Sequence, residues 1–165
     1  MTTNVDFYVL DVNQQKSFFF SCLLLEKLYE QQKSVFVYLN SDEEAQSLDQ
    51  LLWTYRDDSF LPHHLYDPED TFPPPIQLGF KQKPNTLHHV LLNLSDHVPS
   101  FYRAYTAIIE IVFSDPLMQQ LARARYKNYR EEGCQLQTHK LKSNECDATF
   151  IDQLLKTKHE QPKQE

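Results

Sequence analysis

Glycine is nearly absent from this sequence: its 165 residues include only two, Gly79 and Gly133. A fold that binds nucleotides usually places a glycine-rich turn directly after a strand, because only glycine lets the backbone approach phosphate groups closely. Residues 10–15, which follow the first expected strand, read Leu-Asp-Val-Asn-Gln-Gln and hold no glycine. The sequence therefore has no phosphate-binding loop and no dinucleotide-binding fingerprint.

Cysteine and long apolar runs are scarce as well. Three cysteines, Cys22, Cys134 and Cys146, are odd in number and widely spaced, unlike a disulfide framework or a metal knuckle. Residues 1–6 lack the positive region of a secretory signal. The most apolar run, residues 18–25, is far shorter than the roughly 20 residues that span a bilayer. We expect a cytoplasmic protein without a membrane partner.

Residue types that support catalysis or metal binding do not form a recognisable set. His63-His64 and His88-His89 are adjacent pairs, whose side chains would point to opposite faces of a strand. Asp11 follows the first expected strand, where open α/β sheets often carry functional residues. A small phosphatase-like enzyme using Asp11 is one alternative. The sequence, however, identifies neither a full set of acidic ligands nor a partner lysine for such a site. We expect no catalytic residue, no metal and no cofactor.

The residues that are present alternate between strand and helix patterns. Residues 5–10 predict a strand, residues 14–32 an amphipathic helix, and residues 34–39 a central strand buried on both faces. Ser41 and Glu44 predict a capping box at the start of the next helix. This order indicates βαβ units, so the expected fold class is α/β: a single-domain, three-layer, Rossmann-like fold with a mostly parallel central sheet.

Further strands are predicted over residues 76–80 and 88–94, after a long loop over residues 57–75. A helix is expected to begin near Pro99. Residues 108–113 suit either the end of that helix or another strand, and periodicity does not decide between them.

Asp115 and Pro116 predict the start of the last long helix, which should run to residue 131 or 132 with Gly133 just beyond its end. From about residue 139 the chain turns polar. We therefore expect an α/β domain over residues 1–137 and a polar, partly disordered C-terminal extension over residues 138–165.

This last helix carries an unusual charge. Residues 117–130 contain four basic side chains and no acidic one, whereas the rest of the chain has 12 basic and 23 acidic residues. Arg123, Lys127 and Arg130 share one helix face, with Tyr126 beside them. Favourable interaction with the helix dipole is the simple explanation. The exclusion of acids favours a binding site for an anion or an acidic peptide, in which an arginine fork would hold a carboxylate or phosphate.

Trp53 is the second unusual residue. It lies about 100° away from the apolar stripe of its predicted helix, and Phe60 follows in the next loop. Exposed aromatic residues of this kind are typical anchors of protein interfaces, although packing beneath the long loop is an equally good explanation.

Four stretches resemble the chi subunit of bacterial DNA polymerase III, an accessory protein of the clamp loader. They are Phe-Tyr-Val-Leu-Asp at 7–11, Leu-Asp-Gln-Leu-Leu-Trp at 48–53, Ser-Phe-Leu-Pro-His at 59–63 and, most specifically, Gln-Leu-Ala-Arg-Ala-Arg-Tyr-Lys-Asn-Tyr-Arg at 120–130. The resemblance covers roughly residues 5–137 in consistent order.

The resemblance implies an adaptor without catalytic activity of its own, which belongs to a DNA polymerase holoenzyme. One surface, including Trp53 and Phe60, would hold the psi subunit of the clamp loader. The other would receive the acidic C-terminal tail of single-stranded-DNA-binding protein, which ends in an apolar residue and a free carboxylate. The protein would be a monomer or a heterodimer with psi, working at the replisome and meeting nucleic acid only indirectly.

The same resemblance implies a role for each residue of the tail site. Arg123 would clamp the terminal carboxylate, Lys127 and Arg130 would face the acids of the tail, and Tyr126 and Val112 would line the pocket. Gln119 stands where some relatives have a lysine, which would weaken attraction to the upstream acids. The main alternative is direct binding of single-stranded nucleic acid by the same basic helix.

Overall fold

The structure is a computed structural model of the chain that describes residues 2–58 and 60–160, without the side chains of residues 154 and 156–160. Across the described residues, seven strands form one sheet in which every neighbouring pair is parallel, in the order β3-β4-β2-β5-β6-β1-β7. The strands are β1 (Asn4–Leu10), β2 (Val35–Leu39), β3 (His63–Leu65), β4 (Ile76–Phe80), β5 (Val90–Asn93), β6 (Ala107–Val112) and β7 (Gln135–Leu141).

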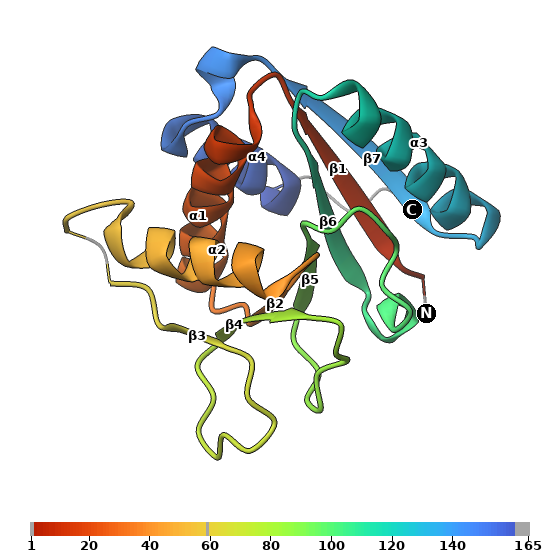
Figure 1. The fold of residues 1–165 in the computed structure, drawn as a ribbon. Coiled ribbons are helices and arrows are strands. Elements are labelled where there is room, and N and C mark those ends of the chain that lie inside the picture. The colour runs from red at the N-terminus through yellow and green to blue at the C-terminus, as the bar shows by residue number, and fades with distance from the viewer. Residues whose placement is uncertain (1, 59, 161–165) are drawn as a thin grey trace.

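Helices cover both faces of this sheet (Figure 1). The α-helices are α1 (Gln14–Glu30), α2 (Asp42–Thr54), α3 (Pro116–Glu131) and α4 (Ala148–Glu160), and two short 3-10 helices are η1 (Tyr102–Ala104) and η2 (Ser143–Glu145). Helices α1, α2 and α4 lie on one face, whereas α3 and η1 lie on the other. The predicted three-layer α/β fold with a parallel sheet is confirmed.

Side-chain alternation along the strands divides the core into two clusters. Tyr8 and Leu10 of β1 pack toward α1, whereas Val5 and Phe7 pack toward α3, because successive residues of a strand point to opposite faces. All five residues of β2 are buried, as expected for a central strand covered on both sides.

Helix starts follow the predicted capping chemistry, with one difference. The Asp115 carboxylate accepts a hydrogen bond from the Met118 amide, which starts α3 at Pro116. Ser41 likewise caps α2 through the Glu44 amide. The Glu44 carboxylate, however, accepts from the Asn40 amide rather than from Ser41, so the predicted capping box is only half formed.

Three local predictions needed correction or completion. The helix expected near Pro99 is wrong, because only the three-residue η1 forms there. Residues 107–112 form strand β6 rather than the end of a helix. The predicted loop over residues 57–75 contains the short strand β3, which extends the sheet beyond β4. Helix α3 ends at Glu131 as predicted, and Gly133 follows with a φ of +86°, a conformation that favours glycine.

The C-terminal part of the chain continues the domain. The boundary predicted at residue 137 falls within β7, which pairs with β1 along its whole length and forms one edge of the sheet. Ile151 of α4 is buried in the cluster between the sheet and α1. Residues 161–165 of the predicted extension lie outside the described residues. Among the described residues, no helix is long and apolar enough to cross a membrane.

Candidate functional site

A buried charge network attaches α3 to the sheet. The Arg125 Nε donates to Oε1 of Glu110 on β6 at 3.0 Å, and both side chains are almost fully buried. The Tyr129 hydroxyl and the Asn93 amide donate to Oε2 of the same carboxylate at 2.7 and 2.8 Å. Burial raises the pKa of the Glu110 carboxyl, while Arg125 and these hydrogen bonds oppose that shift. The network fixes which face of α3 points outward.

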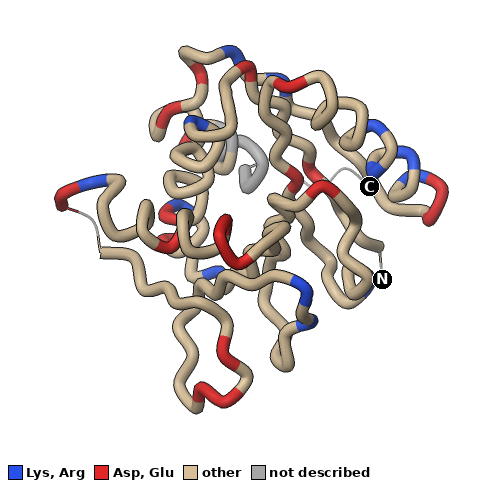
Figure 2. Tube along the Cα trace, viewed as in Figure 1, with Lys and Arg blue, Asp and Glu red and all other residues tan. Residues whose placement is uncertain are grey.

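The outward face carries the other basic residues of the helix. Arg123, Lys127 and Arg130 are exposed and Tyr126 is half-buried; Figure 2 shows the basic residues along this part of α3. Lys127 Nζ lies 3.9 Å from a Glu131 carboxylate oxygen, a weak exposed pair. Among the described residues, neither Arg123 nor Arg130 forms an ion pair. Both guanidinium groups are thus available to an external anion.

Arg123 stands beside a groove of about 420 Å³ between α3 and the β1–β7 edge of the sheet. We call this the α3 groove; it is lined by Phe7, Val9, Val112, Gln119, Ala122, Arg123, Tyr126, Thr138 and Lys140. Three of the residues predicted for the tail site, Arg123, Tyr126 and Val112, therefore lie together. Lys127 and Arg130 lie further along the same helix and are not among the lining residues.

The floor of the α3 groove is apolar. Phe7, Val112 and Ala122 are buried there, and the Tyr126 ring packs on the Phe7 ring at 5.4 Å between centroids. An unpaired guanidinium next to such a floor suits a ligand that combines an apolar side chain with a carboxylate. The groove thus combines an unpaired cation with an apolar floor, the two features that a peptide C-terminus would contact.

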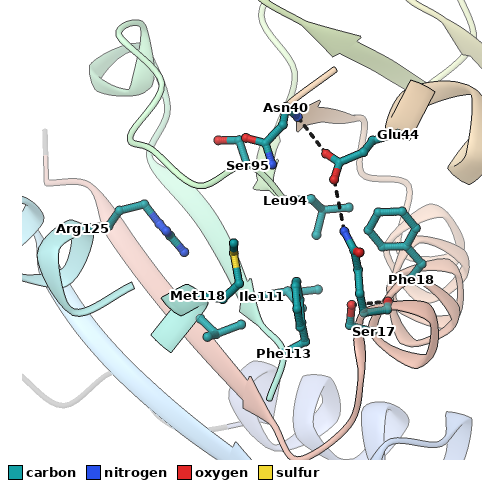
Figure 3. Close-up of a pocket in the computed structure, with 12 residues that line it drawn as sticks. Ser17, Phe18, Asn40, Glu44, Leu94, Ser95, Ile111, Phe113, Met118 and Arg125 are labelled. Carbon is teal, nitrogen blue, oxygen red and sulfur yellow. Dashed lines mark hydrogen bonds between the residues drawn. The ribbon is translucent and has the colours of Figure 1, made fainter. Parts of the chain in front are cut away.

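A second cavity, of about 260 Å³, lies at the carboxyl ends of β2, β5 and β6 (Figure 3). Open α/β folds commonly bind ligands at this edge. Here the Glu44 carboxylate projects into it, held by the Asn40 amide and the Gln14 side chain, each at 3.1 Å. Arg125 also lines the cavity, but its guanidinium is held by Glu110 and the Asp96 carbonyl. A carboxylate without a free cation repels phosphate, so this crevice does not suit a nucleotide.

Trp53 and Phe60 form an aromatic patch on the opposite side of the sheet. Their exposed fractions are 54% and 72%, and their rings lie 6.0 Å apart between centroids. The Trp53 ring also contacts the His63 ring, with 4.5 Å between centroids. The His63 imidazole is in turn held by the Leu61 carbonyl and by Asp49. Because α2 and α3 cover opposite faces (Figure 1), this patch and the α3 groove can be occupied at the same time.

The remaining candidate residues lie outside the α3 groove. His88 is buried and its Nε2 lies 2.8 Å from the Gln77 side-chain oxygen. Asp11 is exposed at the end of β1. Within the described residues, no group of three or more His, Cys, Asp or Glu side chains could hold a metal ion.

Sequence reasoning missed part of the groove, because β7 was not predicted. Thr138 and Lys140 come from this edge strand. The sequence pattern of this strand is weak, because residues 135–141 alternate between polar and apolar types only in part and most of the strand is exposed.

The comparisons with known proteins agree with one another. Residues 1–137 match the family model of the DNA polymerase III chi subunit, HolC. The chain is 32% identical over 140 residues to DNA polymerase III subunit chi of Pseudomonas aeruginosa, which covers 84% of this chain and 97% of that protein. It is 30% identical over 140 residues to subunit chi of Haemophilus influenzae, with the same coverage. Subunit chi of Escherichia coli is 29% identical over 118 residues, or 71% of this chain and 80% of that protein.

Proposed function

This chain belongs to the family of the DNA polymerase III chi subunit, a replication protein, and we propose that it acts as an adaptor within that polymerase. One surface would bind the psi subunit of the clamp loader. The other would bind the acidic C-terminal tail of single-stranded-DNA-binding protein. The chain would thereby tether the polymerase to single strands coated with that protein.

The α3 groove carries the tail-binding part of the proposal. A peptide C-terminus offers a carboxylate and one side chain a few ångströms apart. Arg123 has no ion-pair partner among the described residues and stands at the wall of a groove whose floor is Phe7, Val112 and Tyr126. The guanidinium fork matches the carboxylate, and the apolar floor matches an apolar terminal side chain. Lys127 and Arg130, which lie outside the groove, would add long-range attraction for the acidic tail as it approaches the protein.

The Trp53–Phe60 patch supports the psi-binding part. Large exposed aromatic side chains that contact each other are typical of interface anchors, because covering them with a partner removes much apolar area from water. Trp53 lies on α2, on the face of the sheet opposite α3 (Figure 1), which would allow one chain to hold both partners.

Tethering is the mechanism that this arrangement serves. An adaptor that holds the clamp loader and a coated strand together raises the effective concentration of one at the other. This role needs no catalytic residue, no metal and no cofactor in the chain itself. We place the protein in the cytoplasm, at the replisome, as a monomer or in a heterodimer with psi.

A peptide titration tests the tail site. A peptide with several acidic residues ahead of a C-terminal phenylalanine should bind the wild-type protein. The same peptide with its terminal carboxylate amidated should bind at least tenfold more weakly, because Arg123 then loses its charged partner. Arg123→Ala should lower the affinity for the free-acid peptide to a similar level. Equal binding of the acid and the amide would refute the proposed site.

The two rival functions give different results in the same experiment. If α3 binds single-stranded DNA directly, an uncoated single-stranded oligonucleotide should bind this chain as tightly as the peptide does. Amidation of the peptide should then leave its affinity unchanged. If the chain is a phosphatase-like enzyme, a phosphate ester should be hydrolysed, Asp11→Asn should abolish that hydrolysis, and the peptide should not bind.

A further inference from the structure

We propose that Lys140 of the edge strand β7 is a second binding residue for the acidic tail. It would contact the acidic residues that precede the terminal one, from the wall of the α3 groove opposite the helix. This inference rests on the proposed tail-binding function, and it adds a residue from outside the stretch that matches the chi family model, residues 1–137.

Strand register places Lys140 in the groove. In the parallel β1–β7 pair, Phe7 lies opposite Thr138 and Val9 lies opposite Lys140. Paired residues of neighbouring strands project to the same face of a sheet. Phe7 belongs to the cluster under α3, so Lys140 is also directed to the α3 side. All four residues line the groove.

Lys140 is the cation on the sheet side of this groove, while Arg123 is the cation on its helix side. Lys140 is exposed and forms no ion pair with another described residue. The helix residue Gln119, one turn before Arg123, is neutral and lines the groove with Lys140. Among the residues that line the groove, Lys140 is therefore the one that could offer positive charge to the tail near Gln119.

The groove continues beyond Lys140 in a direction away from Arg123. An adjoining hollow of about 290 Å³ shares Val9, Gln119 and Lys140 with the α3 groove but is not lined by Arg123. A peptide held at Arg123 would pass Lys140 at the entrance to this hollow. Deeper in the hollow, Asp11 and Glu145 offset the charge of Lys142 and would repel an acidic tail. For this reason we assign the contact to Lys140 alone.

Two matched peptides separate this role from binding of the terminal carboxylate. Both end in phenylalanine with a free carboxylate; one carries aspartates upstream, and the other carries asparagine at each of those positions. Affinities are measured by fluorescence anisotropy at low salt for the full-length protein. Lys140→Gln should lower the affinity for the aspartate peptide about two- to fivefold, which is the effect of one exposed charge pair. It should leave the affinity for the asparagine peptide unchanged.

Two further variants complete the experiment. Lys33→Gln removes the same charge from an exposed site between α1 and β2, and it should leave both peptides at wild-type affinity. Arg123→Ala should strongly lower the affinity for both peptides. If Arg123→Ala has no effect, the proposed function itself fails. If Arg123→Ala acts as expected while Lys140→Gln matches Lys33→Gln, or weakens both peptides equally, only the role of Lys140 is overturned.

Discussion

The Arg125 guanidinium lies 3.0 Å from the Glu110 carboxylate beneath α3, and both side chains are almost completely buried. Arg123, two residues earlier, is exposed on the other side of the same helix. The buried pair and the Tyr129 hydroxyl bonded to it determine the rotation of α3 about its own axis. They therefore place Arg123 and Tyr126 at the groove.

The two arginines should consequently respond in opposite ways to truncation. Arg125→Ala leaves the Glu110 carboxylate buried without its cation and should lower the free energy of unfolding by about 3–5 kcal/mol. Arg123→Ala removes an exposed side chain and should change it by no more than about 0.5 kcal/mol. Urea unfolding at neutral pH measures both. Similar losses for the two variants would show that the buried pair does not anchor the helix.

Salt should weaken the proposed interaction with the tail. Exposed charges are screened over about 8 Å at physiological ionic strength, and the cations around the α3 groove are all at or near the surface. The affinity for a peptide with upstream aspartates should fall severalfold between 50 and 500 mM sodium chloride. A matched peptide with upstream asparagines should show a shallower slope, since it forms fewer charge pairs. Parallel slopes would indicate that upstream acids make no contact with the protein.

Trp53 provides an internal reporter of the aromatic patch, because it is the only tryptophan of the chain. With 54% of its surface exposed, its fluorescence should be quenched readily by acrylamide. Binding of psi should bury the ring, shift the emission to shorter wavelength and reduce quenching. Binding of the tail peptide on the opposite face should leave the emission unchanged, and a shift caused by the peptide alone would contradict the assignment of two separate surfaces.

His88 should make the protein less stable in mild acid. Burial lowers the pKa of its imidazole to about 4, from the ordinary value of 6.5. Between pH 7.5 and pH 5 the unfolded chain therefore takes up a proton at this residue while the folded chain does not. The free energy of unfolding should fall by about 2 kcal/mol over this interval on account of His88.

Urea unfolding at the two pH values tests this expectation. On acidification, the free energy of unfolding of His88→Gln should fall by about 2 kcal/mol less than that of the wild type, whatever the stability of the variant at pH 7.5. His64→Gln, which removes an exposed histidine of β3, should keep the wild-type difference. A His88→Gln variant with an unchanged pH dependence would show that His88 is not held neutral.

The strands and helices with strong apolar patterns could be predicted from the sequence. The β2 segment, residues 35–39, is buried throughout, and its unbroken apolar run indicated that position. Helix α3 was bounded correctly because Asp115, Pro116 and Gly133 are specific start and stop signals. The edge strands β3 and β7 were missed, since an edge strand needs little apolar surface and leaves no strong period.

The site was predictable only where its residues lie close together in the sequence. Arg123 and Tyr126 share one helix, and their spacing indicated a common face. Arg125 is one of the four basic residues of the helix, and its burial could not be predicted, because its partner Glu110 lies on a strand that the pattern left undecided. Lys140 depends on the register of β7 against β1, which no local pattern reveals.

The most direct test of the proposed adaptor function is a capture experiment with both proposed partners. Tagged psi is immobilised, and full-length single-stranded-DNA-binding protein is added with the wild-type chain or one of two variants. The wild type should retain the binding protein on psi, and a binding protein without its C-terminal tail should not be retained. Arg123→Ala should stay on psi but lose the binding protein, whereas Trp53→Ala should bind the tail in solution but leave psi. Retention of the binding protein by Arg123→Ala, or retention of the form without a tail, would contradict the account.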